Sequence, residues 1–223
     1  MGTGGPTAMR IDAVLTLTQW FSPAYPVGAF GYSHGLEAAV EAGEVTDAAS
    51  LHAWLHDILE HGTGRADALF LAASHAAESP AEVETIDATA RAFAASAERL
   101  AETTLQGEAF CEITAQIWDH ADLPMFTYPV AAGRAARLCD LPLDLTSAFY
   151  LQAFAANLVA AGQRLAPVGQ AAAQRILHQL APLCSRIARQ TREGDLSTLS
   201  STVFLADLAS MRHETQHSRI FRT

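Results

Sequence analysis

Apolar residues recur at helical spacing along almost the whole chain, and this pattern restricts the possible folds more than any other feature of the sequence. One stretch carries apolar residues at intervals of three and four positions, which places them on one face of a helix: Leu151, Phe154, Leu158, Ala161 and Leu165. The sequence contains no run of alternating β-branched residues and no Asn-Gly hairpin turn. It therefore predicts an all-α, single-domain helical bundle of about eight to ten helices.

Local signals place several helix boundaries. Ser79, with Glu82 three residues later, is typical of a capped helix start, and Tyr128 before a proline predicts another start. Pro182 falls inside a helical pattern, so we expect it to kink or split that helix. The last clear helical pattern covers residues 197–212.

Length and charge restrict the domain organisation and the possible partners. The 223 residues are 50% hydrophobic and 17% charged, which suits one domain with a sizeable core. The net charge of −10 argues against nucleic acids and anionic membranes as partners, because phosphates would be repelled, and it is compatible with a basic protein partner. We expect a flexible leader at residues 1–9 and one domain at residues 10–223.

The sequence predicts neither a signal peptide nor a membrane span. The first ten residues lack the apolar segment of a signal peptide, and no uninterrupted apolar run reaches the length of about 18 residues that a span needs. Three widely separated cysteines, never in a Cys-x-x-Cys pair, predict reduced thiols in the cytoplasm rather than disulfides or a Cys-type zinc site: Cys111, Cys139 and Cys184.

A first short motif resembles a catalytic site. The segment Gly31–Gly35 matches G-x-S-x-G, the nucleophile elbow of α/β-hydrolases, in which the serine lies between a parallel strand and a helix. Pro26 and Gly28 make the preceding segment poor material for a central strand, and no other part of the chain supplies the remaining strands. A hydrolase that uses Ser33 is kept as the alternative hypothesis.

A second short motif resembles a zinc site. His213, Glu214 and His217 form the H-E-x-x-H pattern of metalloproteases. Only six residues follow, so no third ligand is available downstream, and Arg212 and Arg219 would disfavour a cation beside the imidazoles. We expect instead a charged helix end that is exposed to solvent or faces a partner. We predict no catalytic residue, no metal site and no cofactor, with the His213/Glu214/His217 site as a second form of the hydrolase alternative.

Acidic residues one helical turn apart form two pairs in the middle of the chain, Glu98/Glu102 and Glu108/Glu112. Paired carboxylates can serve in acid–base catalysis. Because no pocket or sugar-binding signature accompanies them, we expect these pairs to form a solvated face.

Two longer stretches resemble one known family. Residues Leu17–Glu37 resemble the N-terminal signature of the urease accessory protein UreF family, and residues Ser210–Arg222 resemble its C-terminal signature. Shorter matches at Arg65–Asp67, Tyr128–Val130 and Asn157–Gln170 fall between them in the expected order. The resemblance therefore covers nearly the whole chain.

Four positions depart from the pattern of that family. The family usually has leucine where Tyr25 stands, serine at Gly31, glutamine at His34 and tyrosine at His217. Both motifs that look catalytic thus arise from single departures, Gly31 in the first and His217 in the second. The departure at His217 puts in doubt the contact that the usual tyrosine makes.

The resemblance implies an all-α fold without catalytic groups. UreF proteins are typically dimers that bind the scaffold protein UreD, also called UreH, and recruit the nickel-carrying GTPase UreG. This assembly delivers nickel to apo-urease, and UreF with UreD is thought to form part of the nickel route. We accordingly expect a cytoplasmic homodimer whose partners are UreD/UreH, UreG and apo-urease.

The segment 211–223 is expected to dock to a partner and to become ordered on contact. Its arginines can pair with carboxylates of a partner, and an aromatic ring can fill a pocket. The residues that we expect to bind a partner come from both signatures: Tyr32, Ser33, Glu37, Arg212, His213, Glu214, Ser218, Arg219, Phe221 and Arg222.

Overall fold

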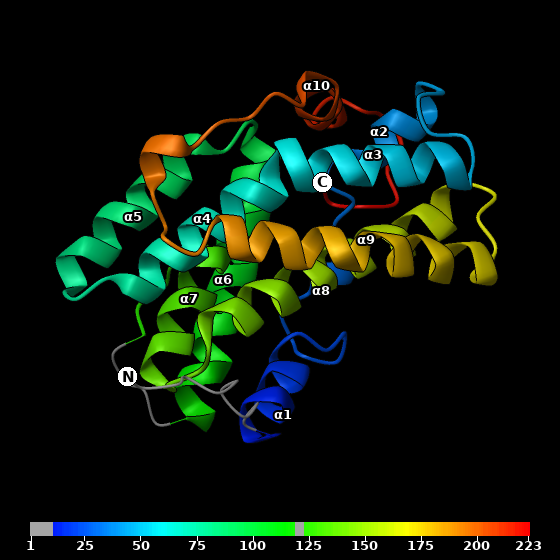
Figure 1. Ribbon diagram of the computed structural model, residues 1–223. Helices are drawn as coiled ribbons and strands as arrows, with labels where there is room; N and C mark the ends of the chain where they lie inside the picture. The colour runs from blue at the N-terminus through cyan, green and yellow to red at the C-terminus, as the bar shows by residue number, and fades with distance from the viewer. Residues whose placement is uncertain (1–10, 119–122) are drawn as a thin grey trace.

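The computed structural model describes residues 11–118 and 123–223, and these residues form ten α-helices and no strand. The helices pack into one bundle (Figure 1), which confirms the predicted all-α, single-domain fold and its number of helices. The predicted leader at 1–9 lies outside the described residues. The helices are α1 (Ile11–Trp20), α2 (Leu36–Glu41), α3 (Ala48–His61), α4 (Thr63–Ala76), α5 (Pro80–Phe93), α6 (Ala97–Ile117), α7 (Tyr128–Leu138), α8 (Leu143–Leu165), α9 (Gln170–Gln190) and α10 (Phe204–His213).

Helix starts with local sequence signals lie where the sequence predicts them. Ser79 caps α5, because its hydroxyl accepts a hydrogen bond from the backbone N–H of Glu82 at 3.3 Å. The carboxylate of Glu82 accepts from the backbone N–H of Glu78 at 2.8 Å, one residue before the cap. Helix α7 begins at Tyr128, and Pro129 occupies a first-turn position that needs no N–H donor.

Two predictions concern the last third of the chain. Pro182 does not split its helix, since α9 runs unbroken from Gln170 to Gln190, and the kink expected there stays a prediction. The last helix does not cover 197–212. A 3-10 turn, η2 (Leu196–Thr198), comes first, and α10 begins only at Phe204. Between them, the backbone N–H of Thr202 donates to the carbonyl of His61 at 3.0 Å, so the end of α3 takes up a donor that a continuous helix would use internally.

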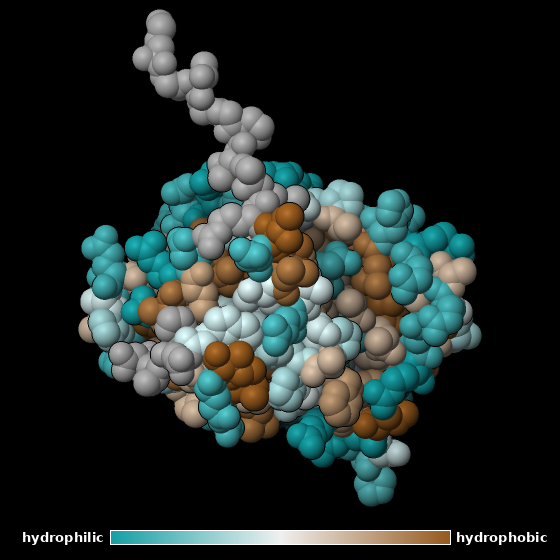
Figure 2. Space-filling view, turned by 90° about the horizontal axis from the view of Figure 1, so that it is seen from below, coloured by the Kyte–Doolittle hydropathy of each residue, from teal (hydrophilic) through white to brown (hydrophobic). Residues whose placement is uncertain are grey.

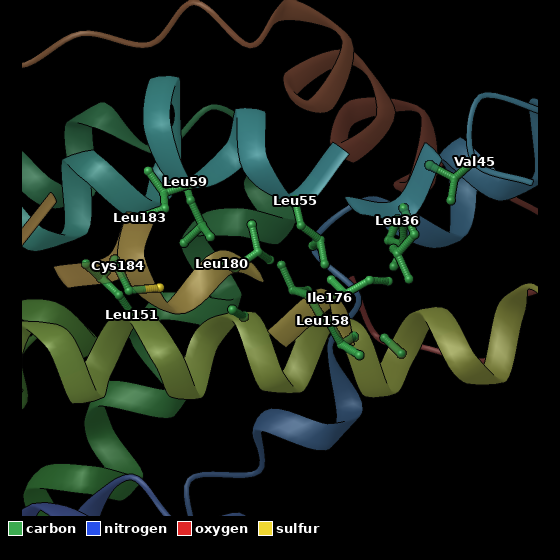
Figure 3. Close-up of a cluster of buried hydrophobic side chains, with 14 of the residues drawn as sticks. Leu36, Val45, Leu55, Leu59, Leu151, Leu158, Ile176, Leu180, Leu183 and Cys184 are labelled. Carbon is green, nitrogen blue, oxygen red and sulfur yellow. The ribbon is translucent and has the colours of Figure 1, made fainter. Parts of the chain in front are cut away.

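The core has two apolar clusters. The first lies between α3, α8 and α9, where leucine and isoleucine side chains from the three helices meet (Figure 3). The second gathers side chains of α1, α6 and α7, and Trp20 packs edge-on against Phe110 at a ring distance of 5.3 Å. Helices α4 and α7 approach so closely that a Cβ atom on Gly133 would lie 2.2 Å from the carbonyl oxygen of Leu71. Glycine is therefore required at this crossing.

Helix α8 is, within the described ranges, the one helix long and apolar enough to cross a membrane. Half of its apolar window is buried by the rest of the protein, and it packs along α9 through the first cluster. This placement is that of a core helix. The face opposite α10 carries apolar side chains in separate patches among polar ones (Figure 2).

Candidate functional site

The C-terminal segment, defined here as residues 214–223, folds back from α10 against α2 and the loop before it (Figure 1). Its backbone pairs with that loop. The N–H of Arg222 donates to the carbonyl of Gly31 at 2.8 Å, and the N–H of Ser33 donates to the main-chain oxygen of Thr223 at 2.8 Å. The hydroxyl of Ser33 donates to the same oxygen of Thr223. The last residues of the segment are thus held against that loop by main-chain contacts.

Glu37 of α2 anchors this segment through its backbone N–H groups. Its carboxylate accepts hydrogen bonds from the backbone N–H groups of Ile220, at 2.7 Å, and Phe221, at 2.9 Å. The side chain is only 6% exposed, so both N–H groups would lack a partner without it. A buried charge is stable only when it is well bonded, and here two backbone donors and an imidazole surround the carboxylate.

His213, the last residue of α10, contacts both Glu37 of α2 and Glu98 of α6. Its ring is fully buried, with Nε2 at 3.2 Å from Oε2 of Glu37 and Nδ1 at 2.7 Å from Oε2 of Glu98. The other oxygen of Glu98 accepts from Arg219 at 2.8 Å. A doubly protonated imidazole can donate to both carboxylates. His213 and Arg219 together therefore fix the C-terminal segment to α2 and α6.

Close backbone approach makes this arrangement possible. Gly35, just before α2, has φ of +76°, and a Cβ atom there would lie 2.7 Å from the backbone nitrogen of Ser210 in α10. The preceding residue, His34, also adopts a positive φ of 57°, which is uncommon for a non-glycine residue. Two successive left-handed residues turn the chain so that Ser33 and Glu37 face the same segment.

Phe221 is buried under a cation. The guanidinium of Arg164, on α8, lies 4.2 Å from the centre of the Phe221 ring, a cation–π contact. The same guanidinium donates to the carbonyl of Phe30 at 3.2 Å. Arg164 therefore links α8 to the C-terminal segment and to the loop that the segment pairs with.

A second charged network lies deeper, between α4, α6 and α8. Arg99 Nη2 is 2.9 Å from Oδ2 of Asp67, and its Nη1 is 3.7 Å from Oε2 of Glu102. Tyr150 donates to Asp67 at 2.7 Å. His34 Nδ1 lies 3.3 Å from Glu102. The hydroxyl of Thr223 donates to Glu102 at 3.3 Å, which connects this network to the C-terminal segment.

The electrostatics of this network follow from burial and pairing. Burial raises the pKa of Asp67 above its ordinary value, although Arg99 and Tyr150 oppose the shift. For Glu102 burial also acts to raise the pKa, but Arg99 and His34 outweigh it and hold the pKa below its ordinary value. The two carboxylates keep Arg99 charged, with its pKa raised despite burial.

Neither catalytic motif has the geometry that its chemistry needs. Ser33 is fully buried with its hydroxyl on Thr223, and a 3-10 turn, η1 (Ala29–Gly31), precedes it where an elbow requires a strand. Helix α10 ends at His213, so exposed His217 lies beyond the helix and not one turn along the same face. Within ranges 11–118 and 123–223, no group of three or more His, Cys, Asp or Glu residues could hold a metal.

The structure divides the residues that we expect to bind a partner into two sets. The buried set supports the fold from inside: Tyr32, Ser33, Glu37, His213 and Phe221. The exposed set lies on the surface: Arg212, Glu214, Ser218, Arg219 and Arg222. His213, the first residue of the H-E-x-x-H motif, is therefore buried inside the protein and not exposed to solvent at a helix end. Binding of a partner by either set stays a prediction.

Several residues of the site escape sequence reasoning. Glu98 and Glu102 do not form the solvated face that their spacing suggests, because both are largely buried and bonded. Arg99 shows no local pattern that separates it from a surface charge, whereas Asp67 and Arg164 lie in stretches that resemble the UreF family, Arg65–Asp67 and Asn157–Gln170. The pair Glu98/Glu102 is a further signal, since two like charges a turn apart call for nearby cations.

Comparison with known proteins agrees with this description. The profile of the UreF family matches residues 45–181. A urease accessory protein UreF from Ruegeria pomeroyi is 57% identical over 210 residues, covering 94% of this chain and 96% of that protein. A urease accessory protein UreF from Roseobacter denitrificans is 52% identical over 215 residues, covering 96% of each. The chain belongs to the UreF family of urease accessory proteins.

Proposed function

We propose that the chain is an adaptor in urease maturation with no catalytic group of its own. In this proposal it binds the UreD/UreH scaffold and recruits the UreG GTPase, so that the complex delivers nickel to apo-urease. It acts in the cytoplasm as a homodimer. Membership of the UreF family supports a role in urease maturation.

The observation that carries the proposal is the surface of the C-terminal segment. Ile220 is 63% exposed although its backbone N–H is bonded to buried Glu37. Arg222 is exposed and has no ion pair among the described residues. An apolar side chain beside a free guanidinium, on a backbone that is already held in place, is suited to bind a protein partner with little ordering cost.

Helix α10 carries further exposed apolar side chains. Four large apolar side chains on α10 are exposed: Phe204, Leu205, Leu208 and Met211. Exposed apolar side chains that gather on one short helix are typical of a contact with another protein. We therefore define the docking surface as the exposed face of α10 together with Ile220 and Arg222.

A co-expression experiment with UreD and UreG tests this proposal. Removing residues 211–223 would also remove buried His213 and Phe221, so loss of binding could reflect a damaged fold. The double variant Ile220→Asp/Arg222→Glu changes only exposed side chains. We expect it to stop co-purifying with UreD and to leave urease inactive, while the thermal midpoint of the isolated protein changes little.

A matched control uses the same substitutions elsewhere. Ile117→Asp/Arg192→Glu changes an exposed isoleucine and an exposed arginine outside the docking surface. Ile117 ends α6, whereas Glu98, which contacts the C-terminal segment, lies near its start. These residues are about 28 Å apart along the helix. The control should bind UreD normally, and equal binding by both double variants would refute the docking surface.

A further inference from the structure

The imidazole of His213 lies between two carboxylates. Its Nδ1 is 2.7 Å from Oε2 of Glu98 on α6, and its Nε2 is 3.2 Å from Oε2 of Glu37 on α2. The ring is fully buried, and the side chains of Glu98 and Glu37 are 13% and 7% exposed. Each ring nitrogen therefore meets a carboxylate oxygen at hydrogen-bond distance, in a place that is almost closed to water.

These contacts determine how many protons the cluster holds. A hydrogen bond needs a donor, and an ionised carboxylate can only accept. A neutral imidazole has one N–H, which serves one of the two contacts and leaves a ring lone pair facing the other carboxylate. A further proton is needed to make both contacts hydrogen bonds. The count is the same whether that proton belongs to the ring or to one of the carboxyl groups.

The charges of the cluster lead to the same count. Arg219 donates to Oε1 of Glu98 at 2.8 Å, so one guanidinium and one imidazole face two carboxylates. With the further proton the positive and negative charges are equal. Without it the cluster keeps an unbalanced negative charge at a buried position, which is costly.

No other charged group among the described residues balances the cluster. Glu41 is exposed at the far end of α2. The remaining charged groups on the elements packed against the ring have partners of their own: Arg212 with Glu44 at 3.7 Å, Glu214 with the backbone N–H of Ala97 at 2.8 Å, Asp207 with the hydroxyl of Ser201 at 3.2 Å, and Glu102 with Arg99 and His34.

The two carboxylates that bind the ring also bind the C-terminal segment. Glu37 accepts from the backbone N–H groups of Ile220 and Phe221, and Glu98 accepts from Arg219. We call the segment held when these hydrogen bonds are formed and released when they are broken. Loss of the further proton makes one carboxylate repel the ring, and movement of either carboxylate withdraws an acceptor from the segment. The bound proton and the held segment therefore stabilise each other.

We propose that the C-terminal segment is held by uptake of a proton and is released as pH rises. In water an imidazole loses its proton above about pH 6.5. Above that pH a released segment must take up a proton to be held, so the ratio of held to released molecules falls by up to about tenfold for each pH unit. Between about pH 5 and 6.5 the imidazole is charged in both states, and pH has little effect. This proposal does not rest on the docking surface or on the role in urease maturation.

Hydrogen exchange at the backbone amides of Ile220 and Phe221 tests the proposal in the isolated full-length protein. The protection factor of an amide already corrects for the intrinsic rise of exchange rates with pH, so it reports the ratio of held to released molecules. We expect both protection factors to be lower at pH 8.5 than at pH 6 by about tenfold or more. Protection factors that agree within about twofold at the two pH values would overturn the proposal.

Glu98→Gln separates a proton switch from a merely structural contact. The glutamine NH₂ can donate to Nδ1 of a neutral His213 while its oxygen accepts from Arg219, and the ring then donates to Glu37 through Nε2. All contacts form without the further proton, so the protection factors of the two amides should no longer fall between pH 6 and pH 8.5. A structural contact alone predicts weaker protection at every pH with an unchanged pH dependence, and that result would refute the switch.

Two control variants locate the proton. Glu112→Gln makes the same substitution at an exposed position of α6, and it should keep the pH dependence of the unaltered protein. His217→Gln removes an exposed imidazole from the C-terminal segment itself and should keep this dependence as well. If His217→Gln abolished the pH dependence, the titrating group would be His217 and the proposed role of the buried cluster would be wrong.

Discussion

Nε2 of His213 lies 3.2 Å from Oε2 of Glu37, although the two residues are 176 positions apart in the sequence. Each depends on the other, because both side chains are buried and each would otherwise leave a polar atom without a partner. The contact joins α10 to α2 and so fixes the point from which the C-terminal segment returns.

Glu37→Gln should loosen the C-terminal segment. An amide supplies one acceptor where the carboxylate supplies two, so its NH₂ group must face either the N–H of Ile220 or the donors at Phe221 and His213. We expect unfolding free energy to fall by about 1–3 kcal/mol, measured by chemical denaturation, and amide hydrogen exchange at Ile220 and Phe221 to accelerate. Glu41→Gln, at the exposed end of α2, should change neither quantity. Unchanged exchange in Glu37→Gln would contradict the anchoring role.

Gly133→Ala should be strongly destabilising. The added Cβ would lie 2.2 Å from both the carbonyl oxygen of Leu71 and the hydroxyl of Ser74, so α7 would have to move away from α4. We expect a loss of about 2–4 kcal/mol, within the range of severe overpacking, measured as a shift of the denaturation midpoint. Gly169→Ala is the control, because nothing lies within 4 Å of its added Cβ, and it should be nearly neutral. Comparable stability of the two variants would refute the close crossing.

Asp67→Asn should weaken the deep network. The substitution removes the charge that pairs with Arg99 at 2.9 Å and leaves a buried guanidinium with Glu102 as its remaining carboxylate. Removing one partner of a buried pair is costly, and we expect about 2–4 kcal/mol of lost stability. Asp57→Asn, on the exposed face of α3, provides a matched control that should change stability by less than about 0.5 kcal/mol. A neutral result for Asp67→Asn would show that the ion pair contributes nothing to the fold.

The three thiols should be unreactive in the folded protein at neutral pH. Burial raises the pKa of Cys111, Cys139 and Cys184 to about 11 each, so little thiolate is present. A thiol reagent at pH 8 should label Cys111 and Cys184 only after denaturation, while half-buried Cys139 reacts slowly. Rapid labelling of Cys111 or Cys184 in the native protein would contradict their burial.

The same shifts predict a pH dependence of stability. Each thiol has a higher pKa in the folded state than in the unfolded state, so below pH 9 it is protonated in both states and has no effect. As pH rises from 9 to 11 the unfolded state ionises first, and the free energy of unfolding should fall. Replacing Cys184 by alanine should reduce this slope. A stability that rises over this pH range would refute the assignment.

Sequence reasoning succeeds where the cause of a structure is local. The start of α5 follows from Ser79 and Pro80, which act within one turn, and the start of α7 follows from Pro129 in the same way. It fails where the partner is distant. Residues 197–203 have a helical pattern, but the carbonyl of His61 binds the N–H of Thr202 and the helix begins later.

The site shows the same limit. Glu98 and Glu102 have the spacing of a solvated face, but both meet a chain segment that lies more than a hundred residues away in the sequence. His213 Nδ1 meets Glu98 across 115 positions, and Thr223 meets Glu102 across 121. No pattern within a single helix encodes such partners. Both signatures resembling the UreF family mark the two stretches that meet here, but neither reveals that half of their residues point inward.

The last four residues of the C-terminal segment have a consequence for how these positions can vary. Their side chains alternate, with Phe221 and Thr223 buried while Ile220 and Arg222 are exposed. Glu37 and the loop before α2 bind main-chain atoms of these residues. Every residue other than proline supplies the same main-chain donor and acceptor. Selection for folding therefore acts on the buried positions, and selection for partner binding acts on the exposed positions between them. The exposed residues can change as the partner changes, while the buried residues keep the segment in place.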